Sequence, residues 1–205
     1  MIYKLNGMYY DANSYLIAGK KNILIDPGTP GNFEFLKNQI EEIVKDIDLI
    51  INTHCHYDHV GSDYLFEDYF DVPIVIHDSE VEHLKKGDDV TVSWLFNANL
   101  NPPREIIPIG EVKDELNKIG IEIIHTPGHT KGSISLVFED KMITGDTLFA
   151  YGVGRWDLPT GSLIELRTSI EKLERIANQK ELTQIYPGHG EVGDLGSFDR
   201  AKMFI

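Results

Sequence analysis

Cysteine is almost absent from this 205-residue chain, in which Cys55 is the only one. A single thiol cannot form an intramolecular disulfide, so nothing indicates an oxidising compartment. Long apolar runs are also missing: no window of about eighteen apolar residues occurs, and residues 1–7 do not resemble a charged leader followed by an apolar segment. The sequence therefore predicts a cytoplasmic protein without a membrane partner.

Positive charge is scarce as well. The chain has 19 Lys and Arg against 33 Asp and Glu, which gives a formal net charge of −14. Such a surface repels phosphate backbones and anionic lipids, so nucleic acids and membranes are not expected as partners. We expect a small-molecule substrate instead.

The order of apolar segments predicts an α/β protein. Hydrophobic residues make up 41% of the chain, enough for one substantial core, and no linker or fixed repeat divides it, so we predict a single domain over residues 1–205. Residues 87–110 fit no period and predict an insertion beside the functional site. The predicted strands are 14–18, 22–26, 49–51, 73–76, 121–124, 133–138 and 141–144, and the predicted helices follow residue 32, include 64–66 and cover about 163–176.

Four potential metal ligands lie within six residues, directly after the strand predicted at 49–51. The segment reads His54-Cys55-His56-Tyr57-Asp58-His59, and this spacing would arise by chance in roughly one shuffled chain in a thousand. Imidazole and carboxylate groups suit zinc, iron or manganese. If the backbone stays extended over 54–56, His54 and His56 point to one side and Cys55 to the other, so Cys55 is not expected to be a ligand.

Three more candidate ligands follow later strands. His129 lies in a Pro-Gly-His loop after residues 121–124, Asp146 follows 141–144, and His189 lies in a second Pro-Gly-His loop. Strand ends hold loops rigidly at one edge of a sheet, where side chains from distant positions can converge. Surplus donors of this kind suggest two ions and hydrolytic chemistry. A separate serine nucleophile is not predicted, because the chain has no Gly-x-Ser-x-Gly elbow.

These seven residues, in this order, resemble the metal-binding positions of the metallo-β-lactamase superfamily. The resemblance implies a four-layer αβ/βα sandwich of two mixed β-sheets with helices on the outer faces. It implies one metal held by His54, His56 and His129, a second held by Asp58, His59 and His189, and Asp146 bridging both together with a hydroxide. Asp58 and Asp146 are thereby the predicted catalytic residues. Zinc is the favoured metal for the two divalent ions, and iron and manganese also suit these ligands.

The segment Gly145–Phe149 and the loop Gly154–Gly161, which reads GRWDLPTG, resemble the glyoxalase II-like branch of that superfamily. This resemblance implies hydrolysis of a thioester such as a hydroxyacyl-glutathione. The short tail after His189 departs from longer members, which carry a basic helical segment for glutathione, so a smaller thioester or ester is also considered. Full occupation of the His-x-His-x-Asp-His pattern argues against the best-known β-lactamase subclass, and the absence of a flavodoxin domain argues against redox diiron flavoproteins.

Two other functions remain open at this point. One is a single-iron persulfide dioxygenase of the same branch, which needs only two histidines and one carboxylate. The other is a non-catalytic module in which the metal only braces the fold.

Several further residues have two interpretations. Asp26 could orient a ligating imidazole or cap the turn at Pro27-Gly28. Arg155 is expected to pair with Asp157, with substrate contact as the alternative. Tyr151 and Trp94 could line a pocket or simply pack, and His125 is expected to be structural.

Overall fold

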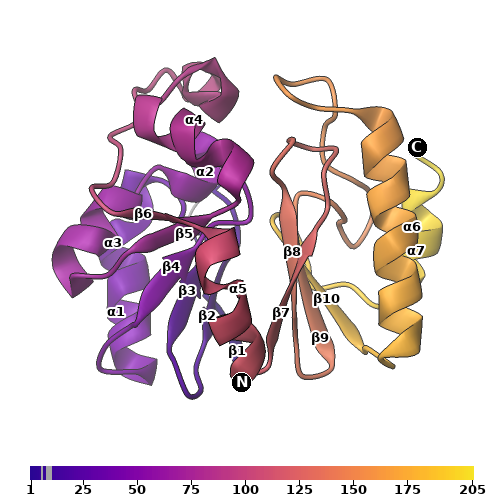
Figure 1. The fold of residues 1–205 in the computed structure, drawn as a ribbon, viewed down its shortest axis with the longest axis horizontal. Helices are drawn as coiled ribbons and strands as arrows, with labels where there is room; N and C mark the ends of the chain where they lie inside the picture. Colours follow the sequence, from indigo (N-terminus) through magenta and orange to yellow (C-terminus); the bar gives the residue numbers. More distant parts are fainter. Residues whose placement is uncertain (6, 8–10) are drawn as a thin grey trace. The chain divides into compact units, whose positions relative to one another are not determined.

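The computed structural model describes residues 1–5, 7 and 11–205, which form two compact units, Met1–Glu111 and Val112–Ile205. The units are described separately (Figure 1). None of the helices in the described part of the chain combines the length and apolar character that crossing a lipid bilayer requires. The prediction of one domain over residues 1–205 stays a prediction.

The first unit is built on a six-stranded mixed sheet in the order β1-β2-β3-β4-β5-β6. The strands β1, β2 and β3 pair antiparallel, and β3 to β6 pair parallel. The strands are β1 (Ile2–Leu5), β2 (Ser14–Ile17), β3 (Ile23–Ile25), β4 (Leu49–Ile51), β5 (Ile74–Ile76) and β6 (Ile106–Pro108). The helices are α1 (Phe33–Ile43), α2 (Tyr57–Val60), α3 (Asp63–Phe70) and α4 (Val81–Lys86), with α5 (Ile109–Lys118) starting at the end of the unit.

Short 3₁₀ turns complete this unit: η1 (Pro30–Asn32), η2 (Asp78–Glu80), η3 (Asp89–Thr91) and η4 (Ser93–Phe96).

The core of the first unit is centred on β3, β4 and β5. These strands are unbroken apolar runs buried on both faces, as expected of parallel strands. Leu36 and Ile40 of α1 and Phe66 of α3 pack against this sheet. Helix α1 has the predicted apolar spacing.

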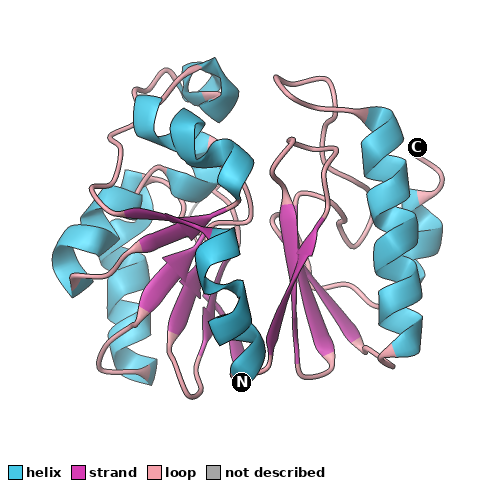
Figure 2. Ribbon diagram, in the orientation of Figure 1, coloured by secondary structure: helices cyan, strands magenta, loops and turns pink. Residues whose placement is uncertain are grey.

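The second unit has a four-stranded sheet in the order β10-β9-β8-β7, in which only β10 and β9 pair parallel. The strands are β7 (Ile121–His125), β8 (Ile134–Phe138), β9 (Lys141–Gly145) and β10 (Gln184–Pro187), and the helices are α6 (Leu163–Gln179) and α7 (Gly196–Ala201). Helices α6 and α7 lie along one face of this sheet (Figure 2). Leu166, Ile170 and Leu173 share the inner face of α6 and pack against the sheet residues Met142 and Ile185.

Candidate metal centre

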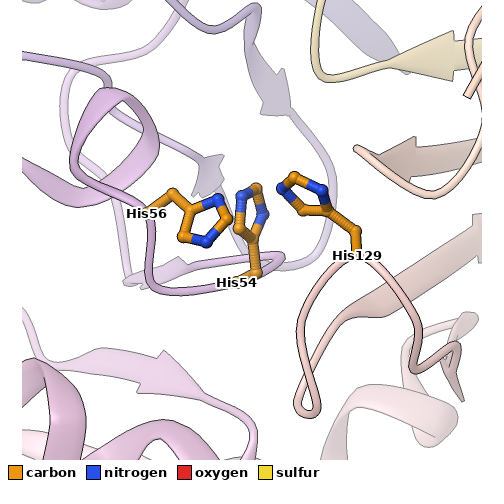
Figure 3. A group of neighbouring side chains, drawn as sticks. All are labelled: His54, His56 and His129. Carbon is orange, nitrogen blue, oxygen red and sulfur yellow. The ribbon is translucent and has the colours of Figure 1, made fainter. Parts of the chain in front are cut away.

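The loop after β4 gathers histidine side chains of the first unit. His54 and His56 lie on that loop (Figure 3), and His56 is the residue before α2, with an extended backbone. The ring centroid of His54 lies 4.6 Å from that of His56 and 4.1 Å from that of His59. All three rings are buried. Asp58 lies beside them, with its Oδ2 3.9 Å from His59 Nε2.

Asp26, in the turn after β3, fixes the orientation of His59. Its Oδ2 lies 2.9 Å from His59 Nδ1 and accepts a bond from Thr53 Oγ1 at 2.7 Å, while Oδ1 accepts from the Thr53 amide at 2.7 Å. A carboxylate can only accept, so Nδ1 of His59 carries the proton and Nε2 is the nitrogen that could bind a metal ion. Asp26 therefore orients the imidazole of His59, as one of its two interpretations expected, whereas the role of His59 as a ligand stays a prediction.

The second unit brings together His129, Asp146 and His189. These residues follow β7, β9 and β10, respectively. Asp146 Oδ2 lies 3.5 Å from His129 Nε2 and 3.6 Å from His189 Nε2. One carboxylate oxygen therefore faces two imidazole nitrogens.

A backbone carbonyl holds the ring of His129, whose place on its loop is seen in Figure 3. Nδ1 of His129 lies 2.6 Å from the carbonyl oxygen of Arg155 and must donate to it, so Nε2 is again the nitrogen that could bind a metal ion. Gly154 makes this approach possible, because a Cβ there would lie 2.0 Å from the Asp146 carbonyl oxygen and 2.8 Å from His129 Nδ1. This contact was not predicted, although the glycine before Arg155 was a signal for a close backbone approach.

The donor set fits divalent metal ions. Two ligand atoms each about 2.1 Å from one tetrahedral ion are roughly 3.4 Å apart. The imidazole-to-carboxylate distances of 3.5, 3.6 and 3.9 Å are close to that separation and too long for hydrogen bonds. In His59 and His129 the Nδ1–H group donates a hydrogen bond to a protein oxygen, on the side of the ring away from Nε2. This arrangement is also typical of metal-ligating histidines.

Three other residues singled out in the sequence have roles other than metal binding. Cys55 is completely buried, and burial raises the pKa of its thiol well above the usual value. Arg155 forms a bidentate pair with Asp157 through two bonds of 2.9 Å, which confirms the predicted ion pair. Nε2 of His125 lies 2.9 Å from the Lys131 carbonyl oxygen, in keeping with a structural role.

The two aromatic residues that could line a pocket or simply pack, Tyr151 and Trp94, are both on the surface. Tyr151 is 69% exposed and lies under the guanidinium of Arg200, whose Cζ is 5.0 Å from the ring centroid. Trp94 is 53% exposed. Substrate contact by Arg155 or Tyr151 stays a prediction.

Comparison with known proteins identifies the family. A model of the metallo-β-lactamase superfamily matches residues 9–189. A probable metallo-hydrolase of Methanocaldococcus jannaschii is 64% identical over 206 residues, which cover 100% of both chains. The hydroxyacylglutathione hydrolase GloC of Haemophilus influenzae is 31% identical over 191 residues, covering 91% of this chain and 88% of GloC.

Solved structures agree. The crystal structure of TTHA1623 in a di-iron-bound form has a TM-score of 0.81 and 26% identity, over 97% of this chain and 98% of that one. The two mixed sheets with their helices are those of the metallo-β-lactamase fold, so the predicted fold class is confirmed. The chain belongs to the metallo-β-lactamase superfamily.

Proposed function

We propose that this protein is a dinuclear metal-dependent hydrolase that cleaves a thioester. The observation that carries the proposal is the position of Asp146 Oδ2, which lies at ligand-to-ligand distance from both His129 and His189. An oxygen in that position is suited to bridge two ions.

In the proposed centre, one ion is bound by His54, His56 and His129 and the other by Asp58, His59 and His189. These two sets are among the side-chain groups capable of holding an ion. Asp26 and the Arg155 carbonyl keep the imidazoles of His59 and His129 in the ligating tautomer. The negative charge of Asp146 would offset the positive charge of the bound ions.

The bound ions would polarise the substrate carbonyl, lower the pKa of a water molecule toward about 7 and stabilise the leaving group. The chain's own residues then have positioning roles. The carboxylates of Asp58 and Asp146 balance the positive charge of the centre, and the buried imidazoles limit the access of solvent. A thiolate leaves without a strong general acid, which suits a site whose residues are committed to metal binding.

The thioester class is supported by the GRWDLPTG loop and by the similarity to GloC. A second candidate is a single-iron persulfide dioxygenase. It is favoured by one observation: His54, His59 and Asp146 form a two-histidine, one-carboxylate set that could hold one ion.

Metal analysis of protein purified without added metal, combined with a thioester assay, separates these functions. Two ions per chain and thiol release would support the hydrolase. One iron per chain, with oxygen uptake on glutathione persulfide and no thioester cleavage, would replace it by the dioxygenase. A bound metal with neither activity would indicate the non-catalytic module.

A further inference from the structure

A short turn of the first unit presents three consecutive apolar side chains to solvent. Trp94, Leu95 and Phe96 of η4 are 53%, 47% and 41% exposed. We call these three residues the η4 patch. Solvent exposure of adjacent large apolar side chains is unfavourable in a soluble protein and commonly marks a binding surface.

The backbone around the η4 patch is held in an unusual conformation. Val92 and Asn97, on either side of the turn, have φ angles of 47° and 49°. A β-branched residue such as Val92 rarely adopts this left-handed region, and strained backbone of this kind is concentrated at functional sites. The turn before it is fixed by Asp88, whose carboxylate accepts from the Val90 amide and contacts His83 Nδ1 at 2.9 Å.

The η4 patch adjoins the helix that carries two of the candidate metal ligands. Turn η4 packs against α2, which includes Asp58 and His59. The ring of Phe96 lies 5.5 Å from the ring of Tyr57, the residue next to His56. Phe96, at one end of the η4 patch, therefore contacts the residue that follows the candidate ligand His56.

We propose that the η4 patch binds the apolar acyl chain of the thioester substrate, an inference that rests on the proposed function. The polar or anionic thiols that carry thioesters in cells are poorly suited to an apolar surface on a chain of net charge −14. An acyl chain is uncharged and gains by leaving water. Its burial would contribute about two- to fourfold in affinity for each methylene group.

The test compares acetyl, butanoyl, hexanoyl and octanoyl thioesters of N-acetylcysteamine, a small uncharged thiol. We expect kcat/KM of the parent to rise by about two- to fourfold per methylene, and the double variant Trp94→Ala/Leu95→Ala to lose most of this dependence. Phe35→Ala is the matched control, because Phe35 is 42% exposed on α1 and is not part of the η4 patch. Equal chain-length dependence in parent and double variant would overturn the proposal.

A binding measurement tests the η4 patch even if the protein hydrolyses no thioester. Tryptophan fluorescence of the parent should change on titration with octanoate, less so with acetate, and the octanoate response should disappear in Trp94→Phe. The failure of catalysis alone would then count against the proposed function, whereas an unresponsive Trp94 would count against the acyl site. Light scattering measures the oligomeric state of the parent and the double variant. If the parent is a dimer that dissociates in the double variant, and the chain-length dependence is the same in both, the η4 patch binds a second copy of the chain and the acyl proposal is wrong.

Discussion

Asp146 is the residue on which the proposed centre depends most. Replacement by Asn keeps its size but removes the charge that offsets two cations, so we expect thioester hydrolysis to fall by at least about a hundredfold. Metal content should fall with it, which elemental analysis of the same preparation measures. A variant that keeps most of its activity and both ions would show that Asp146 does not bridge.

For Cys55 we predict the opposite result, that substitution has little effect on activity or metal content. It lies between two candidate ligands in sequence, yet its thiol is completely buried and its raised pKa keeps it protonated at neutral pH. Cys55→Ser should keep metal content and turnover within a few-fold of the parent. Iodoacetamide should label the parent only after unfolding, and loss of one equivalent of metal in the serine variant would make Cys55 a ligand after all.

Residue types and spacing indicated the candidate donors, and the structure groups their atoms closely enough to hold ions, although their role as ligands stays a prediction. The atoms that orient them were harder to predict. The orienting role of Asp26 could be suggested from the sequence as one of two possible roles, because its carboxylate is visible there as a residue type. The carbonyl of Arg155 was not, because every residue has a carbonyl and only the tertiary approach at Gly154 selects this one.

At the scale of elements, Asp63 links the start of α3 to the end of β4. Its Oδ2 accepts a bond of 2.6 Å from the Asn52 side-chain amide. The Oδ1 atoms of both residues are buried and have no hydrogen-bond partner among the described residues. Burial raises the pKa of Asp63 well above 3.8, so the carboxyl is favoured in its neutral form. A proton on Oδ1 could be donated to Asn52 Oδ1, which would complete a reciprocal acid–amide pair.

The pH dependence of stability follows from this pair. The folded state holds a proton on Asp63 that the unfolded state releases above pH 3.8, so this carboxyl lowers the free energy of unfolding as the pH rises from about 4. Asp63→Asn mimics the neutral form, and its stability relative to the parent should increase between pH 4.5 and 8. Urea denaturation across that range measures the difference.

Asp63→Ala is the control for this prediction. It leaves the buried Asn52 amide without its partner and should be about 1–3 kcal/mol less stable than Asp63→Asn at any pH in the range. Parallel stability curves for the parent and Asp63→Asn would contradict a protonated Asp63.

Elements with strong periodicity were predicted, and elements lacking it were not. The sequence prediction missed β1, which pairs with β2 at the edge of its sheet, and β6, whose three residues are only half-buried and end in a proline. It also missed α5, which is rich in charged residues. The first residues of α5 fall within the segment 87–110, which was predicted to be an insertion. Neighbouring strands and helices stabilise these segments, and that contribution cannot be read from a local pattern.

At the scale of the whole molecule, charge bears on the choice of substrate. The cations after His189 are already engaged: Arg200 pairs with Asp194 at 2.7 Å, and Lys202 pairs with Glu174 at 2.8 Å. Little positive charge there is left to bind the two carboxylates of glutathione. We therefore propose a substrate with a small or uncharged thiol.

This proposal predicts that S-lactoylglutathione is not preferred over the lactoyl thioester of a small uncharged thiol. A preference of a hundredfold in kcat/KM, about 2.7 kcal/mol of transition-state binding, would contradict it. Added salt should raise kcat/KM for the glutathione ester by screening repulsion from the −14 chain, with the neutral thioester as the control. A decrease with salt would reveal cations that attract the glutathione ester.

The crowded position of Gly154 also limits the amino-acid changes that this protein could accept near the proposed centre. Any side chain there would collide with the carbonyl of one candidate ligand and the ring of another. By contrast, Tyr151, Arg155 and Asp157 project into solvent from the same loop region. A saturation library at Gly154 should therefore yield almost no functional clones, whereas libraries at the three exposed positions should tolerate most amino acids and supply the variation from which new substrate preferences can be selected.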